Sequence, residues 1–133
     1  MGIKKLDVIE EFPSQSGSLD ILHFRNLPFT PTRMYWLSRV DSEQSRGGHA
    51  HKELSQVFIV MSGSLRVRFW DGLETIELFL KSGTAPVYVP PGYWRDLDNF
   101  SSDAILLVLA DREFNEADYL RTRDEFLEWK RLS

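Results

Sequence analysis

Short apolar or alternating runs recur along the first 110 residues of the chain, and turn residues separate them. Many short strands with turn signals between them are typical of an all-β sandwich or barrel. The pattern therefore predicts an all-β fold. We expect seven of the runs to form strands: Ser18–Phe24, Met34–Val40, Gln56–Met61, Ser64–Trp70, Glu74–Leu80, Ala85–Val89 and Ala104–Leu109.

Glycine and proline mark the turns between these strands. Ser62-Gly63 and Asp71-Gly72 predict tight hairpin turns, and Pro90-Pro91-Gly92 predicts a further loop. In the strand that joins the two hairpin turns, side chains at alternate positions point to opposite faces. One of these faces is expected to lie in the core, and the two sets are Leu65, Val67 and Phe69, and Arg66, Arg68 and Trp70.

The hydrophobic period changes after Ala110. Asn115 is expected to cap a helix, with Asp118 three residues later, and Phe114 and Tyr119 are placed to pack across the cap. The pattern that follows predicts a C-terminal helix from Glu116 to Lys130. We expect four of its side chains to pack against the sheet: Tyr119, Leu120, Phe126 and Leu127.

The composition favours one compact domain spanning residues 1–133. Hydrophobic residues make up 42% of the chain and aromatic residues 13%, which is enough for a single core. Lysine and arginine together number 16 against 20 aspartates and glutamates, so the formal net charge is −4. This mildly acidic balance argues against a protein that binds nucleic acid by neutralising its phosphates.

The sequence shows no membrane or secretion signal. No apolar run reaches the roughly 18 residues that a membrane-spanning helix needs, and no basic and then apolar segment follows Met1. The chain has no cysteine, which fits a reducing compartment and excludes disulfides and thiolate chemistry. We therefore expect a cytoplasmic protein whose chemistry comes from histidine, tyrosine, arginine and acidic side chains.

The most informative segment contains two of the three histidines, His49 and His51, whereas His23 stands alone and is expected to be structural. Histidines at positions i and i+2 of a strand project to the same face, so both imidazoles can reach one point. This segment and a later one resemble the two sequence motifs of the cupin superfamily. The resemblance implies a cupin jelly-roll barrel, here followed by the C-terminal helix. The matching positions are His49, His51, Gln56 and Gly63 in the first motif, and Pro90, Gly92, Arg95 and Asn99 in the second.

Two positions depart from the cupin metal site. In metal-binding cupins two histidines, a glutamate and a third histidine hold the ion. Here Gln56 stands in the glutamate position and Arg95 in the third histidine position. A neutral amide is a weak ligand and a guanidinium repels a cation, so we expect no metal and no other cofactor, with Glu53 as a conceivable rescue ligand. Without a metal, His49 and His51 are free to accept and donate protons.

A wider resemblance covers most of the chain. Its parts are Arg33-Met34-Tyr35, the block from Arg46 to Lys52, Gln56, the block from Asp98 to Asp103, the run from Val108 to Ala110, and Asp118-Tyr119-Leu120-Arg121. These parts are similar to the WxcM-like nucleotide-sugar 3,4-ketoisomerase family. The resemblance implies a metal-free cupin isomerase that converts a dTDP-4-oxo-6-deoxyhexose to its 3-oxo isomer. That product feeds the synthesis of 3-amino-deoxysugars.

The residue chemistry agrees with such a reaction. Moving a ketone from C4 to C3 needs a base for the C3 proton, an acid for C4, and stabilisation of the enediolate between them. We expect His51 to be the base, His49 to be its partner in proton transfer, and Tyr35 to place its hydroxyl at the sugar oxygens. Arg33 and Arg46 are candidates for the diphosphate, because a guanidinium binds phosphate oxygens in a bidentate fork.

Further residues are expected to contact the substrate. Gln56 and Arg95 occupy the former metal positions, and Trp94 either stacks on thymine or packs at the barrel mouth. In the family resembled, a histidine at the position of Arg95, with an arginine before an early Gly-Ser-Leu, is associated with galacto products, and arginine at that position with gluco products. This chain has Arg95, and Ser16 before Gly17, so we expect dTDP-3-oxo-6-deoxy-D-glucose as the product.

The resemblance also implies a homodimer, in which the apolar and aromatic N-terminal segment could pair with the sheet of another subunit. Two other functions stay open. A nucleotide-sugar 3,5-epimerase-like cupin would also use a histidine base but would exchange protons at two carbons. A non-catalytic cupin that binds a sugar or an effector would keep the pocket without turnover, and Arg95 in a lost metal position would mark it.

Overall fold

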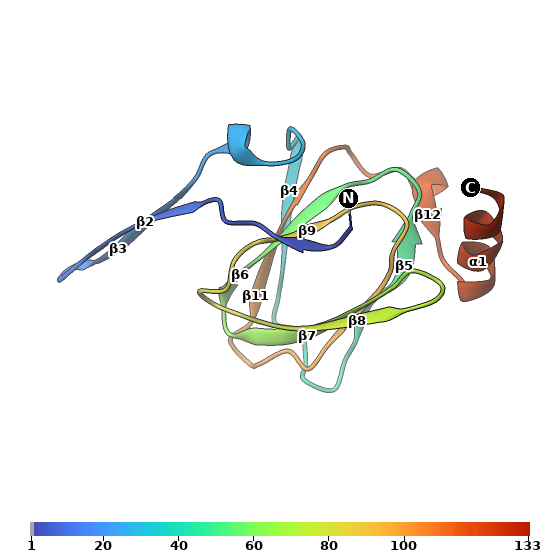
Figure 1. The fold of residues 1–133 in the computed structure, drawn as a ribbon. Helices are drawn as coiled ribbons and strands as arrows, with labels where there is room; N and C mark the ends of the chain where they lie inside the picture. Colours follow the sequence, from blue (N-terminus) through green and yellow to red (C-terminus); the bar gives the residue numbers. More distant parts are fainter. Residues whose placement is uncertain (1) are drawn as a thin grey trace.

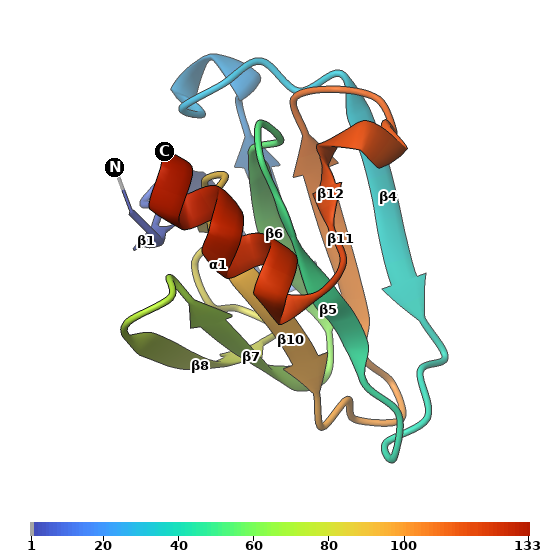
Figure 2. The ribbon, with the colours of Figure 1, turned by 90° about the vertical axis from the view of Figure 1, so that its right-hand side faces the viewer.

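Two antiparallel sheets of five strands each face one another and form a barrel in the computed structural model, which describes residues 2–133 (Figures 1 and 2). The first sheet has the strand order β1-β9-β6-β11-β4, and the second has the order β12-β5-β10-β7-β8. The first sheet consists of β1 (Lys4–Lys5), β4 (Arg33–Ser38), β6 (Gln56–Ser62), β9 (Val87–Val89) and β11 (Ile105–Ala110). The second consists of β5 (Arg46–His51), β7 (Ser64–Trp70), β8 (Thr75–Lys81), β10 (Trp94–Asp98) and β12 (Tyr119–Leu120). The predicted all-β barrel is confirmed.

The main hydrophobic core fills the space between the two sheets. Strand β7 shows how the sequence pattern builds it, because Leu65, Val67 and Phe69 are buried on the inner face. The arginines of β7 lie on the outer face, where Arg66 pairs with Asp98. The prediction that one face of this strand lies in the core is therefore confirmed, and the core face is the apolar one.

All seven predicted strands are present, β7 with the predicted bounds and the other six with ends shifted by one or two residues, as β3 (Gly17–Leu22), β4, β6, β8, β9 and β11. Five strands lie outside those seven ranges: β1, β2 (Ile9–Ser14), β5, β10 and β12, of which β5 carries the His49–His51 pair that was expected to lie on a strand. Strand β10 has the sequence Trp-Arg-Asp-Leu-Asp, in which charged residues hide the alternation of inner and outer positions. Strand β2 contains two glutamates and a proline and buries none of its side chains fully.

The C-terminal segment differs from the single helix that the sequence predicted. Asn115 does cap a helical turn, since its side chain accepts a hydrogen bond from the amide of Ala117, but this turn is the short 3₁₀ helix Glu116–Asp118. The chain then extends into β12, which pairs with β5, and helix α1 begins only after the new cap residue Thr122. Helix α1 spans Arg123–Leu132. The tertiary pairing of β12 thus overrides the local cap signal.

Helix α1 covers the outer face of the second sheet (Figure 2). Phe126 is fully buried there against Ala50, Trp94 and Leu120. Leu127, which the sequence predicted to be buried, is 41% exposed, and its side chain lies near Gly72 in the turn between β7 and β8. Within residues 2–133, no helix has the length and apolar character needed to cross a lipid bilayer.

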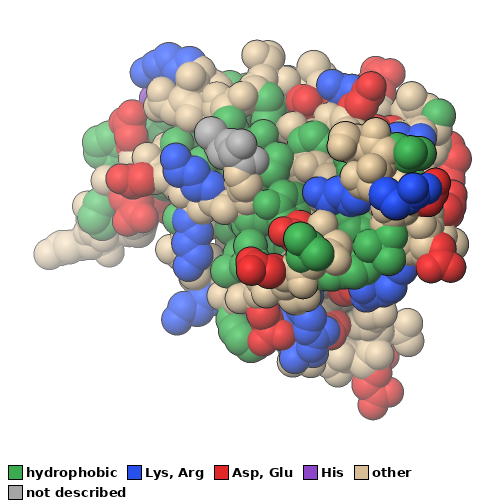
Figure 3. All heavy atoms as spheres, turned by 45° about the vertical axis from the view of Figure 1, so that its right-hand side comes forward, with side chains coloured by type: hydrophobic (Ala, Val, Ile, Leu, Met, Phe, Trp, Pro, Cys, Tyr) green, Lys and Arg blue, Asp and Glu red, His purple; other side chains and the backbone are tan. Residues whose placement is uncertain are grey.

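Strands β2 and β3 form a hairpin that pairs with neither sheet. The hairpin extends from the barrel as a narrow projection (Figures 1 and 3). Phe12 and Leu19 lie directly opposite one another on its two strands and are 52% and 64% exposed. A short 3₁₀ helix, Phe24–Asn26, follows the hairpin and leads into β4.

Candidate active site

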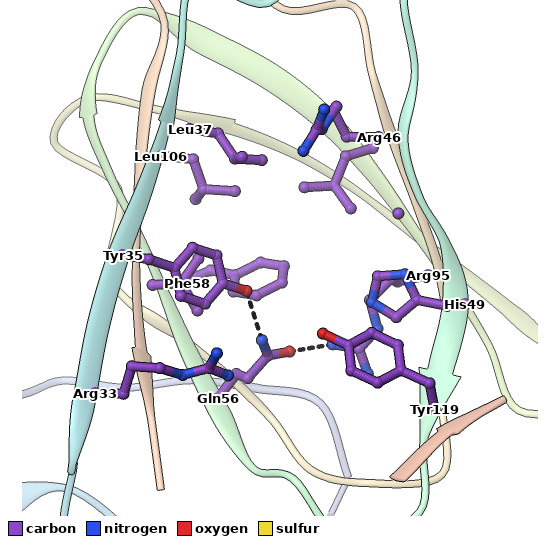
Figure 4. A pocket seen from close by; sticks show the side chains of 13 residues that line it. Arg33, Tyr35, Leu37, Arg46, His49, Gln56, Phe58, Arg95, Leu106 and Tyr119 are labelled. Atoms are coloured by element: carbon purple, nitrogen blue, oxygen red, sulfur yellow. Dashed lines mark hydrogen bonds between the residues drawn. The ribbon is translucent and has the colours of Figure 1, made fainter. Parts of the chain in front are cut away.

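A cavity of about 240 Å³ lies between the inner faces of the two sheets (Figure 4). Strands β4, β5, β6, β10, β11 and β12 supply its walls. Part of the wall is apolar and continuous with the core, and the rest is polar. The lining residues are Arg33, Tyr35, Leu37, Arg46, Gly47, His49, Gln56, Phe58, Arg95, Leu97, Leu106, Val108 and Tyr119.

The two histidines of β5 point into the barrel because they occupy alternate positions of one strand. Ala50 between them faces outward and packs beneath α1. His49 lines the cavity, whereas His51 lies deeper and is 1% exposed. Their rings meet edge to face with centroids 4.8 Å apart. The predicted His-x-His arrangement is therefore present as two imidazoles in contact.

Gly47 lets β5 approach β10 closely at this point. A Cβ atom at Gly47 would lie 2.8 Å from the backbone oxygen of Arg95, and the residue has a φ of +89°. A residue with a side chain would be strained at this φ and would collide with the backbone of Arg95, so this position requires glycine. The close approach places His49 opposite Arg95 in the strand register.

Arg95, Gln56 and Tyr35 form a hydrogen-bonded chain along the cavity wall (Figure 4). The Arg95 guanidinium donates to the side-chain oxygen of Gln56, and the Gln56 amide donates to the Tyr35 hydroxyl at 2.8 Å. Arg95 also donates to the backbone oxygen of Tyr93 at 3.1 Å. Because the Tyr35 hydroxyl accepts a bond from Gln56, its own proton stays available for a ligand oxygen. Burial raises the pKa of Tyr35, which keeps that proton in place.

The polar part of the wall is strongly cationic. Within the described part of the chain, the lining contains three arginines, Arg33, Arg46 and Arg95, and no aspartate or glutamate. The Nε atoms of Arg33 and Arg95 are buried without a hydrogen-bond partner among these residues. Burial lowers the pKa of Arg95 to about 10, so the guanidinium still carries its charge at neutral pH. The cavity is therefore suited to an anionic ligand.

Both imidazoles are held in the neutral form. Burial, and next the charge of Arg95, lower the pKa of His49 to about 4. Burial, Arg95 and then His49 lower the pKa of His51 to about 2. A neutral imidazole is the form that accepts a proton, so the pair can act as bases near pH 7.

The arrangement of Gln56 and Arg95 also bears on metal binding. The Gln56 oxygen, which would be its ligand atom, already accepts a hydrogen bond from the Arg95 guanidinium. A cation at the two histidines would lie next to that guanidinium. Within residues 2–133, no three histidine or acidic side chains cluster closely enough to hold a metal ion.

Two residues that the sequence placed at the substrate lie elsewhere. Trp94 is on the opposite face of β10 from Arg95, is 5% exposed, and packs with Phe126 beneath α1. Of the two alternatives for Trp94, stacking on thymine and packing at the barrel mouth, the structure favours packing, but on the outer face of the sheet and not at the mouth. Ser16 is exposed in the turn of the β2–β3 hairpin and does not line the cavity of its own chain.

Two residues near the histidines were missed as site residues. The Tyr119 ring lines the cavity, with its centroid 5.0 Å from that of His49 and 4.4 Å from that of His51. Asp118 lies beside His51. Both were assigned to the start of a helix, and only their place in the wider resemblance pointed to the site. The pairing of β12 with β5 is what brings them there.

Comparison with known proteins places this geometry in a family. The FdtA family, described as WxcM-like, C-terminal, matches residues 2–131. TDP-4-oxo-6-deoxy-alpha-D-glucose-3,4-oxoisomerase from Aneurinibacillus thermoaerophilus is 39% identical over 113 residues, which cover 85% of this chain and 81% of that protein.

Two solved structures are similar over nearly the whole chain. A 3,4-ketoisomerase from Helicobacter canadensis is 36% identical with a TM-score of 0.91, and the match covers 98% of both chains. The H51N mutant of the 3,4-ketoisomerase QdtA from Thermoanaerobacterium thermosaccharolyticum, in complex with TDP-4-keto-6-deoxyglucose, is 27% identical with a TM-score of 0.93. That match covers 98% of this chain and 95% of the other. The chain belongs to the FdtA family of WxcM-like proteins.

Proposed function

We propose that this protein is an isomerase that converts dTDP-4-oxo-6-deoxy-D-glucose to dTDP-3-oxo-6-deoxy-D-glucose. The observation that carries the proposal is the placement of two neutral histidines at a cavity lined by three arginines. The substrate is anionic at its diphosphate and becomes anionic at the sugar during the reaction. The relatives named as 3,4-ketoisomerases support this reaction, and QdtA with TDP-4-keto-6-deoxyglucose bound supports the substrate class.

The reaction begins with removal of the C3 proton. The C3–H bond breaks, its electron pair forms a C3=C4 double bond, and the former C4 carbonyl oxygen takes the negative charge. We assign this proton transfer to His51, with His49 as its partner at the cavity wall. A positioned base contributes about 10²–10⁴-fold to such a step.

The enediolate is then converted to the 3-oxo sugar by protonation at C4. A proton returns to C4, the oxygen on C4 becomes a hydroxyl, and the hydroxyl on C3 loses its proton as the new carbonyl forms. Protons and electrons balance within the sugar, so no oxidant or reductant is consumed. The product ketone at C3 is the group that a transaminase needs to install a 3-amino substituent.

Arg95 and Tyr35 are placed to stabilise the intermediate. Arg95 is buried and has no carboxylate in contact among residues 2–133, and a buried cation of this kind gains stabilisation when an anion enters the site. The free proton of the Tyr35 hydroxyl can bond a sugar oxygen, since Gln56 fixes that hydroxyl from the other side. Such donors act at the point where negative charge develops.

Arg33 and Arg46 are our candidates for the diphosphate. They stand on the two facing strands β4 and β5 at the cavity wall, and each presents a guanidinium that can bind phosphate oxygens in pairs. A cavity of about 240 Å³ is smaller than the roughly 300–1,000 Å³ typical of sites for drug-sized ligands. We infer that it holds the sugar ring, with the nucleotide toward its mouth.

The test is incubation of the purified protein with dTDP-4-oxo-6-deoxyglucose, followed by proton NMR of the product. A 3-oxo sugar nucleotide is the expected result. Changed configuration at C3 and C5 with the ketone still at C4 would indicate the epimerase alternative. Binding of dTDP without conversion would indicate the non-catalytic alternative.

We also propose that the enzyme is a homodimer in which each hairpin lies against the other copy. A two-stranded hairpin alone is marginally stable in water, and this one projects from the barrel (Figure 1). Its side chains Phe12 and Leu19 are exposed. The outer face of the first sheet exposes Met34, Trp36 and Met61, each by more than half. Apolar surface on both elements favours a symmetric exchange between two copies.

A further inference from the structure

Asp118 lies beside the Nδ1 atom of the His51 ring. Its Oδ2 atom is 3.4 Å from His51 Nδ1, and the two side chains are 7% and 1% exposed. Within residues 2–133, Nδ1 of His51 is buried and has no hydrogen bond of good geometry. The Asp118 carboxylate is therefore the polar group placed to accept a hydrogen bond from an N–H at this nitrogen. Hydrogen bonds at catalytic sites are often long without substrate and tighten when it binds.

The carboxylate is held in place by the backbone that follows β5. Its Oδ1 atom accepts a hydrogen bond from the amide of Glu53 at 2.7 Å, and its Oδ2 atom accepts one from the amide of Leu54 at 3.2 Å. The backbone oxygen of Asp118 accepts a third bond from the amide of Lys52 at 3.0 Å. These contacts fix the Oδ2 atom beside the imidazole without using the imidazole itself.

The chemistry of the two groups decides which nitrogen carries the proton. A neutral imidazole has one N–H and one bare nitrogen, and a carboxylate only accepts hydrogen bonds. Facing Asp118, Nδ1 is the favoured site for the hydrogen, and Nε2 on the other side of the ring is left bare. The bare nitrogen is the one that can take a proton from the sugar.

We propose that Asp118 is a positioning residue for His51, which it keeps in the Nδ1–H form with Nε2 free to accept the substrate proton. The proposal rests on the proposed proton transfer by His51. Once His51 has taken a proton, the adjacent carboxylate also stabilises the imidazolium. The alternative is that Asp118 only fastens the loop from Lys52 to Ser55 to the C-terminal segment.

The chain offers a matched control for that alternative. Asp111 fastens the same loop, since its Oδ1 atom accepts a hydrogen bond from the amide of Ser55 at 3.1 Å. Its side chain is 17% exposed and also pairs with Arg112 at the surface. Asp111→Asn therefore weakens the loop attachment and leaves the surroundings of His51 in place.

The central variant is Asp118→Asn. An asparagine can keep the bond from the Glu53 amide, but it then presents an NH₂ group where Oδ2 stood. That group is a donor, so it favours bare Nδ1 and moves the hydrogen of His51 to Nε2. We expect kcat to fall by at least about 100-fold, as expected for a base held in the wrong tautomer. KM and the Kd for dTDP should stay within about 2-fold, and Asp111→Asn should keep kcat within about 3-fold.

The tautomer is read directly by ¹⁵N NMR of protein labelled at histidine. The chain has three histidines, so His51→Asn identifies the His51 signals by their loss. Wild-type protein should show His51 protonated at Nδ1, and Asp118→Asn should show it protonated at Nε2. This measurement needs no turnover, so it tests the Asp118 assignment even where the variant is poorly active or unstable.

A wild-type His51 protonated at Nε2 would overturn the proposal, as would equal losses of kcat in Asp118→Asn and Asp111→Asn. The double variant Asp118→Asn with His51→Asn should be no slower than His51→Asn alone, because the carboxylate acts through that ring. Failure of the wild type to isomerise the keto sugar would contradict the proposed function alone. The NMR result would still decide what Asp118 does to the imidazole.

Discussion

The imidazole rings of His49 and His51 meet edge to face, with centroids 4.8 Å apart, and they occupy different depths of the barrel. His49 lines the cavity, and His51 lies behind it between Tyr119 and Asp118. The three arginines of the site line the cavity wall and are not assigned to the proton transfer. Proton transfer and binding of the anionic ligand are thus assigned to different side chains and can be removed separately.

The first prediction uses this separation. His51→Asn should abolish isomerisation, with a loss of at least about 10³-fold in kcat, because the proposed base is gone. The Kd for dTDP should change by less than about 2-fold, since no arginine is altered. His49→Asn should be damaging but less so. Turnover by His51→Asn at the wild-type rate would show that the base is assigned wrongly.

The second prediction concerns the effect of the bound diphosphate on the pKa of His49. In the unliganded site, burial and Arg95 hold the pKa of His49 at about 4. The diphosphate of dTDP brings negative charge to the arginines, and nearby negative charge favours the protonated imidazole. We expect dTDP to raise the pKa of His49 by roughly one pH unit. An NMR titration of the histidines between pH 3.5 and 8, with and without dTDP, measures this.

The direction of the pH dependence follows from the protonation state of histidine that acts as the base. Only neutral imidazole accepts a proton, so in the unliganded enzyme the histidines remain competent as the pH falls below 6.5, the ordinary value for histidine. His23 provides an internal control, because it lies beside Glu10 on the hairpin and away from the cavity. Its signals should not respond to dTDP. An unchanged or lowered pKa of His49 on binding would contradict the placement of the diphosphate near this pair.

The third prediction is that activity does not depend on a bound metal. The Gln56 oxygen is engaged by Arg95, and the guanidinium occupies the position that a third histidine ligand would need. Dialysis against a chelator should leave kcat and KM unchanged within error, and elemental analysis of the purified enzyme should find no stoichiometric metal. A metal present at one ion per chain, together with loss of turnover on chelation, would refute this prediction.

The sequence predicted the elements whose side chains alternate cleanly and missed those fixed by distant pairing. Strand β7 alternates apolar and polar residues, and its observed bounds are the predicted ones. Strand β10 carries the charged residues Arg95, Asp96 and Asp98, so its sequence shows no alternation of apolar and polar residues. In the barrel Arg95 nevertheless lies on the inner face and is 2% exposed. Only the tertiary structure shows that one of these charges is buried.

The residues of the candidate site divide in the same way into those that local sequence predicts and those fixed by distant pairing. Residues within a motif, such as His49 and Gln56, could be assigned from their spacing and line the cavity together. Asp118 and Tyr119 could not, because the cap at Asn115 predicts a helix through them. Their strand pairing with β5 depends on residues more than 60 positions away in the sequence. Ser16 was assigned from its position in the family pattern, and in the structure it lies in the hairpin turn and outside the cavity of its own chain.

The fourth prediction tests the proposed dimer. The double substitution Phe12→Asp with Leu19→Asp places two carboxylates on one face of the hairpin, where we expect a second copy to bury apolar side chains. Burying one such side chain contributes about 1.5–3 kcal/mol, and a symmetric dimer loses each contact twice. The dimer should weaken by at least about 100-fold in sedimentation equilibrium.

Phe79→Asp is the matched control, because Phe79 is 68% exposed on β8, an edge strand of the other sheet. This variant should remain dimeric. A wild-type protein that sediments as a monomer at micromolar concentration would exclude the proposed exchange. A hairpin double variant as dimeric as the wild type would show that the interface lies elsewhere.

The last prediction concerns the configuration at C4 of the product. The enediolate is planar at C3 and C4, so the face from which the proton arrives at C4 decides between a gluco and a galacto sugar. An arginine, with an ordinary pKa above about 12, cannot deliver and recover protons as an imidazole does. Arg95 is therefore expected to orient the sugar or stabilise charge, and for the gluco product the C4 proton has to come from a second donor on the face opposite to the histidine that emptied C3.

In the D-gluco ring H3 and H4 lie on opposite faces, so the expected product dTDP-3-oxo-6-deoxy-D-glucose requires C4 to be protonated from the face opposite to the one from which the C3 proton leaves. The proton coupling between H4 and H5 measures the outcome, because an axial H4 in the gluco product gives a large coupling and an equatorial H4 gives a small one. In deuterated water the product should carry deuterium at C4, because the proton that arrives there is not the one removed from C3. A small coupling would overturn the gluco assignment.

The variant that tests control of the protonated face is Arg95→His combined with Ser16→Arg. The histidine adds a proton donor at the position of Arg95, which is 2% exposed and donates to Gln56. Ser16 lies in the hairpin turn and outside the cavity of its own chain, so its substitution should matter only where the hairpin of a second copy reaches the site. We expect the double variant to shift the product toward the galacto sugar. Adding Phe12→Asp and Leu19→Asp should remove the contribution of Ser16→Arg and leave that of Arg95→His, whereas a product mixture identical in all variants would show that neither position sets the face.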